Sequence, residues 1–160
     1  MSARLWRKSA RNLSLSLLFA RSQVIPFLVG ALLAVAVAAL GKITRFDQDR
    51  SFYPTVLVII ASYYILFAIL GGSPHALAWE TMIAFAFSTV AVFGALRLPV
   101  LVGIGIVAHG LFDLVHHVII QNPGVPPWWP SFCMSIDVLL GLWVIGLYCL
   151  RRNNPLKAFH

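Results

Sequence analysis

Long apolar stretches, interrupted by short polar or proline-rich segments, run through almost the whole chain. They occupy five ranges: 24–41, 54–71, 76–96, 98–120 and 131–150. A helix rises about 1.5 Å per residue, so about 20 apolar residues cross the roughly 30 Å hydrocarbon core of a bilayer. The pattern predicts an all-α fold, an integral membrane bundle of five transmembrane helices.

Prolines and glycines fall near the predicted ends of these helices. Prolines lie near the starts and glycines near the ends, as helix termini prefer (Pro26, Pro54, Pro99 and Pro130; Gly41, Gly71 and Gly72). The segment 121–130, QNPGVPPWWP, contains four prolines, which exclude a helix, and two tryptophans, which are typical of the membrane–water interface. We expect this segment to form a stiff loop at the membrane surface.

The N-terminal segment, residues 1–22, has a different pattern. It contains no acidic residue, and its basic side chains fall on one helical face opposite an apolar face (Arg4, Arg7, Lys8 and Arg11 against Trp6, Ala10, Leu13 and Leu17). This pattern predicts an amphipathic basic helix in the lipid headgroup layer, although a signal peptide or an organellar transit peptide are alternatives. The expected organisation is an interfacial segment at 1–22, a five-helix transmembrane domain at 23–150 and a basic tail at 151–160.

Composition excludes several classes of protein. Of the 160 residues, 60% are hydrophobic and 11% are charged, and the mean hydropathy is +0.88. Soluble domains contain about 25% charged residues, so a water-soluble enzyme, a disordered chain and a disulfide-stapled secreted domain are excluded. The net charge of +7 comes from basic residues that flank the spans, so it indicates membrane topology rather than nucleic-acid binding. We expect a multi-pass protein of the cell membrane, with membrane lipid as its partner.

Carboxylates and imidazoles are unusually placed for a passive bundle. The chain has five acidic residues, and three of them, Glu80, Asp113 and Asp137, fall inside predicted spans. A charged group at the centre of a membrane helix costs about 2.5–3.5 kcal/mol, so such residues usually have a function. Within HGLFDLVHH, the side chains of His109, Asp113, His116 and His117 fall in one stripe of a helix, a pattern with which histidine and carboxylate chelate zinc or another divalent transition metal.

The alternating direction of the spans brings these residues to one side of the membrane. We call side X the side at which the second span ends, and side Y the opposite side. Glu80 and Asp137 lie near the starts of the third and fifth spans, and 109–117 lies near the end of the fourth, so all of them are expected near side X. Side chains expected to orient the site are His75, Ser88, Cys133 and a tyrosine of the second span, Tyr63 or Tyr64.

Several of these residues belong to motifs that resemble a known family. The motifs are Trp79-Glu80, Gly103-Ile-Gly105, His109-Gly-x-x-Asp113-x-x-His116-His117, Asn122-Pro123, Pro126 and Cys133-x-x-x-Asp137. With them, residues 52–148 resemble a family of small bacterial integral membrane proteins of uncharacterised function, the domain of unknown function 6010. The resemblance implies a fold and a family, and it implies no activity.

The leading functional hypothesis is a metal-dependent hydrolase that acts on a lipid-like ester or amide. His109, Asp113 and either His116 or His117 would bind Zn²⁺, Glu80 would act as the general base, and Asp137 would complete or serve the site. One alternative is a proton or metal-ion transporter that uses the same cluster, and another is a non-catalytic protein with a structural polar cluster. A homo-oligomer formed through Gly103 and Gly105 is a further hypothesis, although the glycines do not form a small-xxx-small pair.

Overall fold

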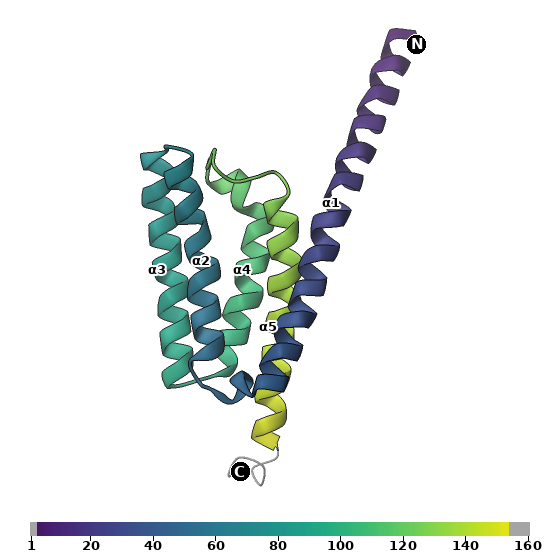
Figure 1. Cartoon of the computed structure of the whole chain (residues 1–160). Helices are drawn as coiled ribbons and strands as arrows, with labels where there is room; N and C mark the ends of the chain where they lie inside the picture. Colours follow the sequence, from purple (N-terminus) through teal and green to yellow (C-terminus); the bar gives the residue numbers. More distant parts are fainter. Residues whose placement is uncertain (1–2, 154–160) are drawn as a thin grey trace.

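The computed structural model of the chain describes residues 3–153, and it describes side chains for residues 22–150. In these residues it contains helices and connecting loops and no strand, which confirms the predicted fold class. The helices are α1 (Ala3–Thr44), a 3-10 helix η1 (Phe46–Gln48), α2 (Phe52–Leu70), α3 (Pro74–Leu96), α4 (Val100–Ile119) and α5 (Trp129–Asn153) (Figure 1). Each of the five α-helices contains a segment long and apolar enough to cross a membrane.

The first helix is longer than the sequence pattern predicts. α1 is continuous from Ala3 to Thr44, and only its part from Ser22 onward has the length and composition of a membrane span. Pro26 lies inside α1, so the prediction that it marks a helix start was wrong. Proline removes one backbone hydrogen bond, but transmembrane helices tolerate this loss. The side chains of the predicted interfacial segment, and most of the predicted tail at 151–160, lie outside the described residues, and their proposed roles stay predictions.

Helix packing divides the bundle into two groups. α1 packs on α5, α5 packs on α4, and α2 packs on α3. Contacts of α4 with α2 and α3 join the groups, whereas the described residues form no extensive packing of α2 on α1 or α5. Figure 1 shows the result: α1 leans against α5 at one edge of the molecule, and its N-terminal half projects beyond the other helices.

Glycines allow α4 and α5 to approach closely. A Cβ atom on Gly103 would lie 2.9 Å from the carbonyl oxygen of Gly141, and one on Gly110 would lie 2.8 Å from Cβ of Asp137. This approach brings α4 beside Asp137 of α5. Gly103 and Gly105 are both buried inside the chain, so the face that suggested dimerisation is used within the bundle. A homo-oligomer stays a prediction.

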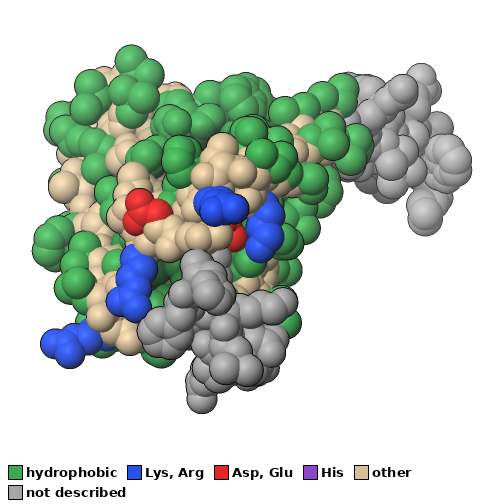
Figure 2. Space-filling view, turned by 60° about the horizontal axis from the view of Figure 1, so that its bottom comes forward, with side chains coloured by type: hydrophobic (Ala, Val, Ile, Leu, Met, Phe, Trp, Pro, Cys, Tyr) green, Lys and Arg blue, Asp and Glu red, His purple; other side chains and the backbone are tan. Residues whose placement is uncertain are grey.

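The two ends of the bundle differ in polarity. Toward side Y the core of the spans is apolar, and it includes Leu57, Val102, Ile106 and Val144, each with 0% exposure. All Lys and Arg residues of the range 22–150 lie in or beside the side Y loops, where Figure 2 shows basic side chains gathered on the surface (Lys42, Arg45, Arg50 and Arg97). The buried histidines and the carboxylates of the spans lie in the half of the bundle toward side X.

The loop before α2 holds its own acidic residue in place. The backbone N–H and the hydroxyl of Ser51 both donate to Asp49 Oδ1 at 2.8 Å. These hydrogen bonds, the backbone one first, lower the pKa of the Asp49 carboxyl below its ordinary value. Asp49 therefore stays ionised at neutral pH beside the basic residues of side Y.

Alanine substitution tests the close contact between α4 and α5. We expect Gly103→Ala to lower the free energy of unfolding by about 1–3 kcal/mol, because its methyl group would meet the backbone of α5. Gly146→Ala in α5 is the matched control, because its Cβ would have no neighbour within 4 Å. We expect Gly146→Ala to be neutral or to add up to about 1 kcal/mol through helix propensity. Denaturant unfolding in detergent micelles measures both, and equal effects would contradict the packing described.

Candidate functional site

One histidine and two aspartates form a buried group between α4 and α5. His109 Nδ1 lies 2.8 Å from Asp137 Oδ2 and 3.7 Å from Asp113 Oδ2. The three residues are 2%, 0% and 1% exposed in the order His109, Asp113, Asp137, so all three side chains are buried. One potential ligand atom from each residue lies within 4.8 Å of the others, which is a spacing suited to a metal ion. We call these three residues the His-Asp-Asp group.

Two carboxylate oxygens of this group have no hydrogen-bond partner among the described residues. They are Asp113 Oδ2 and Asp137 Oδ1. A buried acceptor without a partner costs about 1–3 kcal/mol, and more when it is charged, so native structures rarely leave one unexplained. A cation bound between the two carboxylates would satisfy both oxygens.

Tyr64 of α2 orients the first of these aspartates. Its hydroxyl donates to Asp113 Oδ1 at 2.7 Å, and its ring stacks on the imidazole of His116 with centroids 4.0 Å apart. Between the two tyrosines that the sequence offered, the structure selects Tyr64. Tyr63 is 39% exposed and packs edge-on against Trp129 instead. Adjacent residues point about 100° apart on a helix, and the rotation of α2 about its axis decides which one faces α4.

A second polar pair lies on the other side of the Tyr64 ring. His116 Nε2 lies 2.7 Å from Glu80 Oε1, and both residues are buried. The side-chain amide of Asn122 donates to Glu80 Oε1 at 2.9 Å and to the carbonyl oxygen of Tyr64 at 3.1 Å. Asn122 therefore joins α2, α3 and the loop that follows α4. Sequence reasoning did not assign it a role at the site, although it belongs to the motif Asn122-Pro123.

The structure brings only part of the predicted metal-ligand set together. His116 pairs with Glu80 and does not lie beside His109, because it is two turns further along α4, about 10 Å from it. His117 is exposed, since it points about 100° away from His116. Asp137, expected to complete or serve the site, takes the place of these histidines beside His109 and Asp113.

The remaining predicted residues lie outside the His-Asp-Asp group. His75 is exposed, and its Nε2 accepts from Trp79 Nε1 at 3.3 Å. Ser88 donates to the carbonyl oxygen of Ala84 in its own helix. Cys133 is buried one turn before Asp137 and lines a cavity with it.

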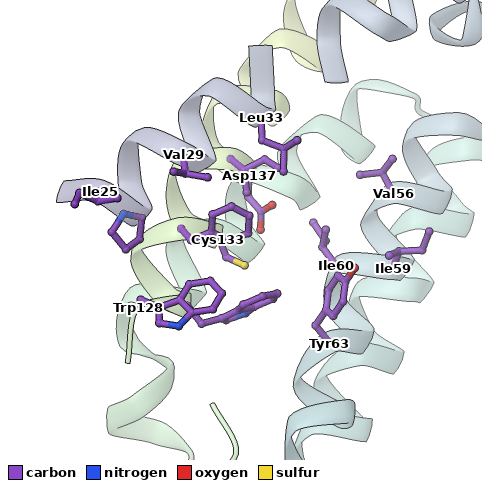
Figure 3. A pocket seen from close by; sticks show the side chains of 14 residues that line it. Ile25, Val29, Leu33, Val56, Ile59, Ile60, Tyr63, Trp128, Cys133 and Asp137 are labelled. Atoms are coloured by element: carbon purple, nitrogen blue, oxygen red, sulfur yellow. The ribbon is translucent and has the colours of Figure 1, made fainter. Parts of the chain in front are cut away.

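Two hollows reach the polar residues of the bundle, one with an apolar lining and one with a mixed lining. An apolar cavity of about 710 Å³ lies between α1, α2 and α5, and Figure 3 shows the Asp137 carboxylate and the Cys133 sulfur directed into it. A second pocket of about 390 Å³ opens at side X, and its lining includes His116, His117 and Asn122. The first pocket meets the His-Asp-Asp group, and the second meets the His116–Glu80 pair.

The fold and the site define a class of protein. Helices long and apolar enough to span a membrane surround a buried set of imidazoles and carboxylates, so the chain is a multi-pass membrane protein with a polar centre inside its bundle. It belongs to DUF6010, a family of unknown function, whose model matches residues 22–150. The match covers all five spans and every site residue described above, and it confirms the resemblance seen in the sequence motifs. No curated protein and no solved structure matches the chain significantly.

Removing one hydroxyl group tests the role of Tyr64. We expect Tyr64→Phe to lower the free energy of unfolding by about 1–3 kcal/mol, because Asp113 Oδ1 would lose its donor in a buried site. Tyr63→Phe is the matched control on the neighbouring, partly exposed position, and we expect an effect within about 0.5 kcal/mol. Unfolding in detergent with a denaturing surfactant measures both variants. A Tyr64→Phe protein as stable as the wild type would contradict this hydrogen bond.

Proposed function

We propose that this protein is an intramembrane hydrolase that uses a divalent transition metal, zinc in the first instance, to cleave a lipid-like ester or amide. The observation that carries the proposal is the His-Asp-Asp group, in which two buried carboxylate oxygens lack hydrogen-bond partners beside an imidazole nitrogen. Because leaving these oxygens without partners is costly, a bound cation is the simplest account of their burial.

The chemistry of the donor atoms fits such an ion. Imidazole nitrogen and carboxylate oxygen suit zinc, iron or manganese, whereas calcium and magnesium prefer more oxygen ligands. In a tetrahedral site with bonds of about 2.0–2.2 Å, the ligand atoms lie about 3.3–3.6 Å from one another. The ligand atoms of the group lie within 4.8 Å of one another, so binding an ion would draw the most distant of them together by about 1 Å. Three protein ligands are typical of catalytic zinc sites, which keep one position open.

The residues of the chain supply the rest of the reaction. A bound metal would lower the pKa of a coordinated water and polarise a substrate carbonyl. Tyr64 holds Asp113 in one orientation, and the close contact at Gly110 holds Asp137 beside α4. In the net reaction water adds to the carbonyl carbon, the carbon–oxygen or carbon–nitrogen bond breaks, and the proton of the water passes to the leaving alcohol or amine. We assign the acceptance of that proton to Glu80. Because its partner His116 lies two turns from His109 along α4, the proton would reach Glu80 through bound water rather than by direct contact.

Two separate openings, one for the lipid and one for water, support the proposed hydrolysis. The apolar cavity reaches Asp137 from the lipid-facing side of the bundle, and the pocket at side X borders His116. A lipid can therefore approach Asp137 from one direction, while water can approach the His116–Glu80 pair from another.

The rival hypotheses account for less of the structure. A transporter needs a polar route through the whole bundle, but below the site, toward side Y, the described core is filled by apolar side chains with 0% exposure, such as Leu57, Ile106 and Val144. A purely structural polar cluster would be expected to satisfy its own hydrogen bonds, and the His-Asp-Asp group leaves two acceptors without partners.

Elemental analysis of purified protein tests the metal site. We expect about one zinc, iron or manganese ion per chain in protein prepared without chelator, and its loss in His109→Ala and in Asp137→Asn, because each variant removes a ligand. His75→Ala and His117→Ala are the controls, since both histidines are exposed and outside the group, and they should keep the ion. Wild-type protein without metal, in buffers supplied with zinc, would overturn the proposal.

Hydrolysis is tested separately from metal binding. We expect metal-loaded protein in lipid nanodiscs to cleave a long-chain fluorogenic ester or amide, and Glu80→Gln to lower kcat by about 10²–10⁴-fold while the metal content stays unchanged. The reason is that glutamine keeps the size of the side chain and loses its ability to accept a proton. Bound metal without turnover of either probe would contradict the hydrolase and leave the metal site standing.

A further inference from the structure

The apolar cavity between α1, α2 and α5 opens sideways to the bilayer. It exists because α2 does not pack extensively on either α1 or α5. Its wall contains residues of the membrane spans, and several of them are also exposed on the outer surface of the bundle, including Ile25, Val29 and Ile59 at 70%, 50% and 48%. At this depth the surrounding medium is lipid, so the occupant of the cavity comes from the membrane.

The size and lining of the cavity suit a hydrocarbon chain. Its volume of about 710 Å³ lies within the range of about 300–1,000 Å³ typical of small-molecule sites. Aliphatic side chains of three helices form most of the wall, and Tyr63, Trp128 and Trp129 close one part of it. Figure 3 shows the aliphatic side chains surrounding the space into which the Asp137 carboxylate is directed.

One polar group marks where the reacting part of such a ligand would lie. Asp137 is 1% exposed, lines the cavity and has an oxygen, Oδ1, without a hydrogen-bond partner. Nε1 of Trp129 is also buried without a partner, and this residue lines the same cavity. The cavity thus combines an apolar wall with two polar atoms that a ligand could satisfy. A carbonyl oxygen can accept from Trp129 Nε1, and a hydroxyl or amide N–H can donate to Asp137 Oδ1.

Depth disfavours an anionic phosphate beside Asp137. Residues 22–41 of α1 contain no Lys or Arg, and the Lys and Arg residues of 42–150 lie in or beside the loops of side Y, so none of these side chains lies at the depth of Asp137. Proteins bind phosphate with Arg, Lys or helix N-termini, and Asp137 would repel it. Asp137 also follows Trp129 by eight residues, about 12 Å along a helix, so a charged headgroup would have to leave the membrane surface to bring its ester there.

We infer that the cavity binds the acyl chain of an uncharged lipid, an ester or amide without phosphate, whose hydroxyl or amide N–H donates to Asp137. The inference rests on the proposed function only for the hydrolysis of the lipid. Binding of the lipid in the cavity does not depend on it. A neutral acyl ester can move to the depth of Asp137 at little cost, because it carries no charge into the hydrocarbon layer.

Photocrosslinking in nanodiscs tests this inference. The probes are a monoacylglycerol and a phosphatidylcholine that carry the same diazirine-labelled acyl chain, and mass spectrometry maps the labelled residues. We expect the monoacylglycerol to label cavity residues about tenfold more than the phosphatidylcholine does, which corresponds to about 1.4 kcal/mol. Ile60→Trp should abolish this preference by filling the cavity, whereas Leu66→Trp, on an exposed position of the same helix outside the cavity lining, should keep it.

Labelling is measured on both chelator-treated and metal-loaded protein. A preference for the neutral probe in both samples supports the inference even where no hydrolysis is found, because the binding step is then independent of the reaction. Equal labelling by the two probes, a preference for phosphatidylcholine, or the same loss in Ile60→Trp and Leu66→Trp would overturn it. Each of these results leaves the metal and turnover measurements unaffected, so failure of the inference is distinguishable from failure of the proposed function.

Discussion

The need to satisfy carboxylates that are buried in a membrane determines the arrangement of this bundle. Lipid offers no hydrogen bonds, so each buried acid requires a partner from the protein. Asp137 finds His109, Asp113 finds Tyr64, and Glu80 finds His116 and Asn122. Every one of these interactions joins two different elements of the chain. The polar centre therefore connects α2, α3, α4, α5 and the loop after α4 in the half of the bundle near side X.

Close packing and open space are equally necessary to this architecture. α4 and α5 approach until the Cβ of Asp137 leaves no room for a side chain at Gly110, and this contact holds His109 beside the aspartates. α2 stands away from α1 and α5, and the cavity that results reaches Asp137. A bundle with uniform glycine-mediated contacts would have buried the same acids without access for a ligand.

The two ends of the bundle differ in polarity and in access to the buried polar residues. The core of the spans toward side Y is apolar, and the basic residues of the described side chains surround that end. Toward side X, a pocket of mixed lining borders His116 and an apolar cavity borders Asp137. This asymmetry favours chemistry at one membrane surface over passage through the bundle, and no Lys or Arg of residues 22–150 lies at the depth of Asp137.

The number, length and direction of the spans were determined by the sequence alone, because hydropathy and the thickness of a bilayer depend only on position along the chain. Because successive spans run in opposite directions, Glu80, Asp113, His116 and Asp137 lie toward the same side of the membrane. Proline positions predicted helix starts less well, since Pro26 lies within α1, where a membrane helix tolerates the lost hydrogen bond.

Which imidazole meets which carboxylate was decided only by the tertiary structure. Periodicity places His109, Asp113, His116 and His117 on one stripe, but it contains no information on the rotation of α2, α3 and α5 about their axes. That rotation selected Tyr64 over Tyr63, paired His116 with Glu80, and brought Asp137 to His109. The cavity could not be predicted from the sequence either, because it forms where α2 does not pack extensively on α1 or α5. A gap between helices depends on how all of them pack together, and no single segment of sequence encodes it.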